Sequence, residues 1–225
     1  MSTADFITRL EDLKAGERSR LRSLAARPLD ARLDGFDLFT GLWWPLRHDS
    51  PQAPRRETSW LIAKLFGAFG SAVPHVRPEG QEVGPTLPAV LGVCEPRHEH
   101  KGPRFRTRFD ALLCSPLPAL EPHLRWALGE VARAVAGRTP HARSVTGIDW
   151  ARLLDDLSIW DRGEEHRLHR DIRDSWAEAY LDAAKGTYQS RDREGVVVAT
   201  PADGAQPTAH ALGSSTDTND QPQGA

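Results

Sequence analysis

Apolar residues recur at helical spacing along nearly the whole chain, and this periodicity decides its fold class. In residues 147–161 (GIDWARLLDDLSIWD), two tryptophans and three leucines fall on one helical face, and Asp149 occupies the N-cap position. Strand-type alternation of useful length occurs only at 196–198. We therefore expect an all-α fold of two packed helical clusters, of the helical-bundle type.

The same spacing predicts a series of further helices. Their ranges are 5–14, 17–27, 36–45, 59–69, 87–93, 104–114, 120–137 and 164–184. Pro45 is expected to end the third of these helices, and Gly137 and Gly186 to follow the ends of two others. The 59–69 segment is apolar nearly all round, which predicts a helix buried on most sides.

Composition divides the chain into four parts. We expect an N-terminal helical cluster at 5–69, a Gly/Pro-rich connection at 70–103, a C-terminal helical cluster at 104–188 and a disordered tail at 190–225. The tail is rich in Ala, Gly, Ser, Thr and Pro, and its few large apolar residues cannot offset the entropy lost on ordering.

Two cysteines, Cys94 and Cys114, stand outside any paired motif, so a disulfide framework is not expected. The sequence contains no uninterrupted apolar stretch as long as a membrane span. These features predict a soluble, cytoplasmic protein without a membrane partner.

Basic residues gather in three patches, although the formal net charge is −2. Of 29 basic and 31 acidic residues, 2 and 5 follow Gln189, so the rest of the chain is close to neutral. Taken singly, each patch is typical of a solvated face; together they indicate a track for phosphate groups. The residues predicted to bind nucleic acid are Arg18, Arg20, Arg22, Arg27, Lys101, Arg104, Arg106, Arg108, Arg138 and Arg143. The seven tryptophans mostly take inward helical positions, which favours core over base stacking.

Signals of catalysis are weak. Cys94, His98 and His100 form C-x3-H-x-H, which could bind zinc only with a fourth ligand such as Cys114 or His123, and the spacing matches no standard module. Phosphate loops of the Walker type, nucleophile elbows and H-E-x-x-H are absent from the sequence. We therefore expect no enzyme, no cofactor and no metal.

The acidic side of the 147–161 helix admits three interpretations. Asp155, Asp156 and Asp161 could be catalytic carboxylates, a docking surface or solvated charge. Neighbouring residues on a helix point about 100° apart, so Asp155 and Asp156 cannot easily share one substrate atom. Solvated charge or protein docking is therefore the favoured interpretation.

The order of the segments resembles the CasB family, the small subunit of the type I-E CRISPR Cascade effector complex. The resemblance rests on GERSRLRSLA, WWPLR, WLIAKLFGAF, RTRFDALL followed by LEPHLRWALGEVA, and IDWARLLDDLSIWD with RDSWAEAYL, spanning about residues 6–181. The Asp-Trp-x-x-Leu-x-x-Asp-Leu-x-x-Trp pattern is the most specific part. The sequence departs from the family at 70–103 and after about residue 190, and nothing is carried over to either.

The resemblance implies a non-catalytic subunit that acts in antiviral defence, in which the acidic helix is a structural or subunit-facing element and the arginine patches are the working surface. Two copies would line the complex beside its large subunit and backbone subunits and hold DNA strands by their backbones during R-loop formation, while the guide RNA reads the sequence. The family's basic residues map onto Arg18, Arg20, Arg22 and Arg108; the other predicted residues come from charge pattern alone. The alternative is a helical protein–protein adaptor without direct contact to nucleic acid.

Overall fold

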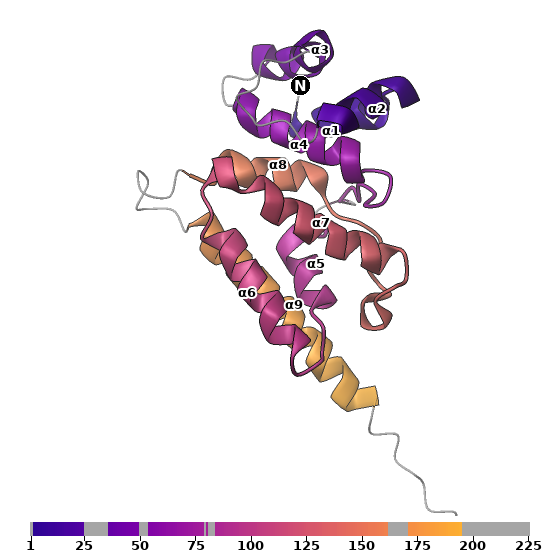
Figure 1. Cartoon of the computed structure of the whole chain (residues 1–225), viewed down its shortest axis with the longest axis vertical. Helices are drawn as coiled ribbons and strands as arrows, with labels where there is room; N and C mark the ends of the chain where they lie inside the picture. Colours follow the sequence, from indigo (N-terminus) through magenta and orange to yellow (C-terminus); the bar gives the residue numbers. More distant parts are fainter. Residues whose placement is uncertain are drawn as a thin grey trace, which may run out of the picture.

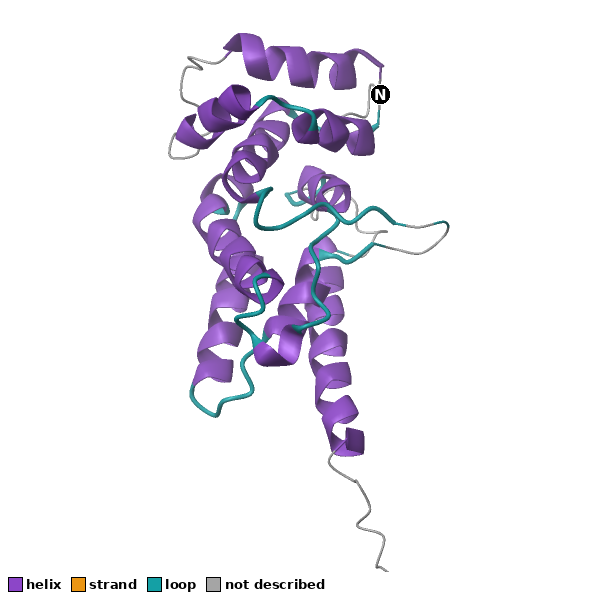
Figure 2. Ribbon diagram, turned by 90° about the vertical axis from the view of Figure 1, so that its right-hand side faces the viewer, coloured by secondary structure: helices purple, strands orange, loops and turns teal. Residues whose placement is uncertain are grey.

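The computed structural model describes residues 2–24, 36–49, 54–78, 80, 84–161 and 171–194. Within these ranges the chain forms helices and no strand, as Figure 2 shows, and the only bridge between extended segments joins His75 to Ile148. The helices are α1 (Thr3–Glu11), α2 (Ala15–Leu24), α3 (Phe36–Asp49), α4 (Arg56–Phe69), α5 (Leu87–Cys94), α6 (Lys101–Leu113), α7 (Glu121–Val135), α8 (Trp150–Ser158) and α9 (Ile172–Glu194), with short 3-10 turns η1 (Leu117–Ala119) and η2 (Pro140–Ala142). The all-α prediction is confirmed.

Helices α1–α4 lie at one end of the molecule and α5, α6 and α9 at the other, with α7 and α8 between them (Figure 1). Helix α8 packs against α1 and α4, and α7 packs against α4, α5 and α6. Buried side chains from both ends form one continuous apolar core. The helices before and after the Gly/Pro-rich segment therefore share a core.

The core follows the predicted helical faces. The two tryptophans and three leucines of the 147–161 segment are each at most 1% exposed, and the Asp149 carboxylate accepts a hydrogen bond from the backbone N–H of Arg152, as expected of an N-cap. In α4 every residue from 58 to 67 is buried, which confirms a helix enclosed on most sides. Gly137 follows α7 with φ 70°, the left-handed conformation expected at its C-terminal end.

Helix α5, predicted within the Gly/Pro-rich segment, packs along α9. Gly92 allows this approach, because a Cβ atom at that position would lie 2.3 Å from the backbone oxygen of Tyr180 in α9. A larger residue would force the two helices apart. The 70–103 segment thus supplies a central helix of the structure.

Three predicted boundaries differ from the structure by more than three residues. Helix α3 continues through Pro45 to Asp49, although a proline inside a helix loses one hydrogen bond and costs about 3 kcal/mol. Leu42 and Leu46 are buried on either side of Pro45, so packing outweighs this cost. Helix α9 begins at Ile172 and not at 164, because Asp171 is not helical and its carboxylate accepts the backbone N–H of Arg173.

The C-terminal end of α9 is also later than expected. The helix continues through Gly186, which keeps a helical backbone at a cost of about 1 kcal/mol relative to Ala, and ends at Glu194. Residues 190–194 therefore belong to a helix and not to a disordered tail. The remainder of the expected tail, 195–225, lies outside the described residues, as does the strand-like 196–198 segment.

Candidate nucleic-acid interface

Cationic side chains of α6 converge on a groove between α6 and α7. Lys101, Arg104 and Arg108 stand at positions i, i+3 and i+7, which places them on one helical face, while Phe105 and Phe109 are buried on another. The three cations line a cavity of about 720 Å³. The other residues of this α6–α7 groove are Pro96, Phe105, Thr107, Trp126, Glu130, Arg133, Arg138, Thr139, Pro140 and His141.

Trp126 forms part of the groove and is only partly buried. Its ring meets Phe105 edge to face at 5.0 Å between centroids, and the Arg108 guanidinium lies 5.9 Å from the Trp126 ring centroid. Sequence reasoning assigned this tryptophan to the core and did not select Arg133. The signal was present, because Trp126, Glu130 and Arg133 follow one another at i, i+4 and i+7 on one face of α7.

Arg106, predicted with its neighbours, does not line the groove. Its guanidinium donates to the buried carboxylate of Glu95, at 2.8 Å from Nε and 2.7 Å from Nη2. The other Glu95 oxygen accepts the hydroxyl of Tyr180 at 2.7 Å. Burial, followed by this hydrogen bond, raises the pKa of Tyr180. Arg106 thus neutralises a carboxylate that joins α6 to α9.

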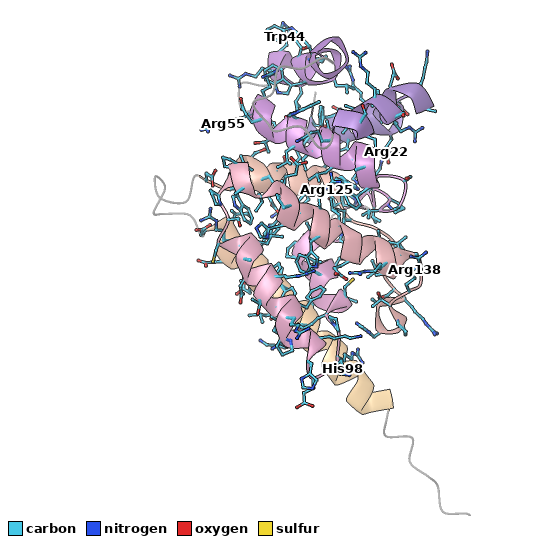
Figure 3. All side chains as sticks on the ribbon, viewed as in Figure 1. Arg22, Trp44, Arg55, His98, Arg125 and Arg138 are labelled. Atoms are coloured by element: carbon cyan, nitrogen blue, oxygen red, sulfur yellow. The ribbon has the colours of Figure 1, made fainter. Side chains whose placement is uncertain are left out.

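The predicted basic patch formed by Arg138 and Arg143 is divided. Arg138, after the end of α7, lines the α6–α7 groove, whereas Arg143 is exposed outside it. Figure 3 shows Arg138 and Arg22 toward the same edge of the molecule and Arg55 toward the opposite one. Arg22 and Arg138 therefore lie toward the same edge in this view.

Two arginines of α2 line a second cavity, between α2 and α4, with a volume of about 600 Å³. Arg18 Nε donates to the backbone oxygen of Leu13 at 2.8 Å, and Arg22 Nε donates to that of Gly67 at 3.3 Å. Arg20 lines a different depression, beside Lys14 and Glu17. Arg27 lies outside the described residues.

The acidic side of α8 makes contacts within the protein. Asp156 is 4% exposed, and its carboxylate accepts Arg152 Nε and Trp176 Nε1, each at 2.8 Å. Solvated charge and docking are therefore wrong for Asp156. Asp155 accepts the hydroxyl of Thr3, and Asp161 accepts the guanidinium of Arg173 together with the backbone N–H of Leu117. Burial is the main cause that raises the pKa of Asp155 and of Asp156.

Cys94, His98 and His100 are not arranged as the ligands of a metal site. Burial raises the pKa of the Cys94 thiol to about 12, which disfavours the thiolate that binds zinc. His98 and His100 are exposed, with ring centroids 5.9 Å apart. Across the described parts of the chain, no three His, Cys, Asp or Glu side chains are grouped so that they could hold a metal ion.

None of the described helices combines the length and apolar character that a membrane crossing requires.

Residues 17–181 match the family model of CRISPR-associated protein Cse2 (CRISPR_cse2). A CRISPR-associated protein of the Cse2 family from Thermus thermophilus is 26% identical, with a TM-score of 0.54 over 81% of this chain and 99% of that one. CasB from Thermus thermophilus is also 26% identical over the same shares, with a TM-score of 0.53. CasB of M. ruber, 20% identical with a TM-score of 0.52 over 87% and 97%, supports the fold. No curated protein matches. Because the family model covers most of the helical body, the chain belongs to the CRISPR-associated Cse2 (CasB) family.

Proposed function

We propose that this protein is a non-catalytic, nucleic-acid-binding subunit of an RNA-guided CRISPR effector complex of the Cascade type. It holds DNA strands through backbone contacts during R-loop formation and so serves antiviral defence. Family membership supports a role in a CRISPR system. The α6–α7 groove supports direct contact with nucleic acid.

The convergence of cations in that groove carries the proposal. Lys101, Arg104 and Arg108 come from α6, Arg133 from α7 and Arg138 from the following turn, so the positive charge is assembled from separate elements. Glu130 is the acidic residue of the lining, and it forms an ion pair with Arg133. Guanidinium groups present paired N–H donors that match phosphate oxygens.

The groove suits backbone binding better than base readout. Of its cations, Arg133 is engaged by Glu130 and Arg108 lies over the Trp126 ring, while Trp126 adds an apolar surface on which a base or sugar can rest. Contacts of this kind position a strand without reading its sequence, a task that an RNA guide performs by base pairing. We therefore place the DNA backbone along α6.

In this proposal the partners are the large subunit and backbone subunits of the complex, together with the guide RNA and target DNA. Two copies of the chain take part, in the cytoplasm. The adaptor alternative assigns the same surface to protein contacts alone, and it predicts that loss of the groove cations disturbs assembly and not DNA binding.

The test compares full-length protein with the double variant Arg104→Gln/Arg108→Gln. Affinity for DNA of mixed sequence is measured against salt concentration. Losing two phosphate contacts should weaken binding and flatten the slope of log affinity against log salt by about one unit per contact. The matched control Arg9→Gln/Arg55→Gln removes two exposed arginines that do not line the groove. Equal affinity and slope in wild type and the groove variant would refute the proposal in favour of the adaptor.

A further inference from the structure

The α6–α7 groove leaves most of its positive charge exposed. Its lining combines one carboxylate with five exposed cations, Lys101, Arg104, Arg108, Arg133 and Arg138. The carboxylate, Glu130, pairs with Arg133, and the other four cations form no ion pair with any residue in the described ranges. The groove therefore presents a net positive charge to any anionic chain that reaches it.

An acidic segment of the same chain follows α9. Residues 195–225 contain three carboxylates, Asp203, Asp217 and Asp220, and no Lys or Arg. All 29 basic residues and 28 of the 31 acidic ones precede this segment, so the formal charge is +1 before residue 195 and −3 after it. The match to the family model ends at residue 181, so the segment lies beyond the matched part of the chain. The groove and the segment are thus opposite in charge.

Helix α9 runs antiparallel to α6. The Tyr180 ring of α9 stacks on Phe109 of α6, with centroids 4.2 Å apart. One turn earlier in α9, Trp176 meets Trp160, whose indole donates to the backbone oxygen of Ser115, just after α6. Earlier residues of α9 therefore lie against later residues of α6, as the paths of the two helices in Figure 1 show. The first residues of α6, at one end of the groove, face the later part of α9.

The end of α9 brings the acidic segment within reach of the groove. Helix α9 continues for 14 residues after Tyr180, about 21 Å, whereas α6 begins eight residues before Phe109, about 12 Å. The helix therefore ends about 10 Å past the level of Lys101, the first groove cation. Asp203 follows Glu194 by nine residues, a length of chain that spans up to about 30 Å when extended. The carboxylates can therefore reach the groove from the end of α9.

We propose that residues 195–225 of this chain occupy the α6–α7 groove and compete there with nucleic acid. Their three carboxylates pair with the exposed cations of the groove. Three such pairs are weak at an exposed surface, but attachment to the same chain gives the segment a high effective concentration at the groove. The contact of the segment with the groove rests on charge and reach, whereas the competition also rests on the function proposed above.

The competition is reversible because nucleic acid carries a charge at every phosphate and displaces the segment. The segment thus lowers the affinity of the groove for DNA that is free in solution. A strand that the complex already holds beside the groove has a high effective concentration of its own, so it still displaces the segment. The groove would therefore favour strands delivered by the complex.

The first test is carbodiimide cross-linking of the full-length protein, which joins a carboxylate to a neighbouring lysine amine. Mass spectrometry of the monomer band then identifies the joined residues. Lys101 lines the groove, and the exposed Lys14, between α1 and α2, is the matched control. We expect cross-links from the segment to Lys101 and not to Lys14. Their yield should fall in Arg104→Gln/Arg108→Gln and at high salt, because the contact is electrostatic.

The second test compares DNA binding by wild type and by the full-length variant Asp203→Asn/Asp217→Asn/Asp220→Asn. At low salt the variant should bind DNA of mixed sequence about threefold more tightly or better, and the difference should fade as salt rises. The control Asp12→Asn/Glu57→Gln/Asp174→Asn removes the same charge from exposed positions outside the groove. It should change the affinity by less than about twofold.

Absence of cross-links from the segment to Lys101 would overturn the contact, and so would equal cross-linking of Lys14. Cross-links confined to a dimer band would assign the groove to the segment of a second copy and overturn the contact within one chain. An equal gain in affinity in both charge variants would show an effect of net charge alone and overturn the competition. Cross-links to Lys101 that excess DNA leaves unchanged would refute DNA binding in the groove while the contact stands; DNA binding without these cross-links would refute the contact alone.

Discussion

The indole Nε1 of Trp176 donates a 2.8 Å hydrogen bond to the carboxylate of Asp156, and both side chains are buried. The rings of Trp160, just after α8, and Trp176 of α9 meet edge to face with centroids 4.9 Å apart. Together with the Asp156 hydrogen bond, this contact joins α8 and the residues after it to α9. The other carboxylate oxygen of Asp156 accepts Arg152, which is half exposed. Asp156, on the acidic side of α8, thus contributes to packing and accepts a hydrogen bond from the buried indole N–H of Trp176.

Replacing Asp156 with Ala should lower the free energy of unfolding by about 1–3 kcal/mol, because Trp176 Nε1 would lose its acceptor in the core. Urea denaturation followed by tryptophan fluorescence measures the change. Asp156→Asn keeps an oxygen acceptor and should lose less than Asp156→Ala. Equal losses in the two variants would show that the hydrogen bond contributes nothing.

Stability should also depend on pH through Asp156. Burial raises the pKa of its folded-state carboxyl above the usual 3.8, so the native state holds the proton more tightly than the unfolded chain does. The resulting stability is fully present below pH 3.8 and is lost as pH rises through the folded-state pKa. The stability of wild type relative to Asp156→Asn should therefore fall as pH rises through this window, in denaturation curves measured from acidic to neutral pH. A relative stability that rises with pH would mean that the Arg152 ion pair outweighs burial.

Local periodicity was sufficient to predict the helices and their buried faces. Trp150, Leu153 and Leu157 needed only their own spacing, because a helix of about ten residues defines its apolar side without its neighbours. The ends of the helices were harder to predict from the sequence. The start of α9 depends on the Asp171 cap, and the passage of α3 through Pro45 depends on burial that other elements provide.

The candidate nucleic-acid interface could be predicted only in part, because it too depends on contacts between elements that are distant in the sequence. Helical spacing places Lys101, Arg104 and Arg108 on one face, and it also separates Arg106 from them by position. The partner of Arg106, Glu95, precedes α6 by a loop whose path the sequence does not indicate. Contacts between segments distant along the chain, such as Asp156 with Trp176, leave no periodic signal.

Gly92→Ala should destabilise the protein by about 1–3 kcal/mol or more, since the added methyl group would meet the Tyr180 backbone oxygen and separate α5 from α9. Gly129→Ala is the matched control. It lies inside α7 with nothing within 4 Å of its would-be Cβ, and it should stabilise the helix by up to about 1 kcal/mol. Thermal melting of both variants tests the contrast, and a Gly92→Ala variant as stable as wild type would contradict the close α5–α9 contact.

The ion pair between Lys64 and Glu121 joins α4 to α7, with Nζ 2.6 Å from the carboxylate oxygen and the lysine side chain fully buried. Glu121→Gln should cost about 3–5 kcal/mol, because it removes the carboxylate that faces a buried ammonium group. Lys64→Met keeps the apolar stem and removes the charge, and Glu121 is partly exposed, so we expect a smaller loss. Chemical denaturation ranks the variants, and the reverse order would show that solvation of Glu121 dominates.

Arg106 and Arg104 both lie on α6, but we expect Arg106 to contribute to stability and Arg104 to DNA binding. Arg106→Gln removes the partner of Glu95, whose side chain is 3% exposed, and should lower stability by about 1–3 kcal/mol while the salt dependence of DNA binding stays unchanged. Arg104→Gln should show the opposite pattern, because Arg104 is exposed, lines the α6–α7 groove and fills no part of the core. Denaturation and salt-dependent DNA binding, both measured below the melting temperature of the less stable variant, give the two readouts. The contrast would be contradicted if Arg106→Gln flattened the dependence of DNA affinity on salt as much as Arg104→Gln does. In that case Arg106 would also contact phosphate, and its ion pair with Glu95 would not be its only role.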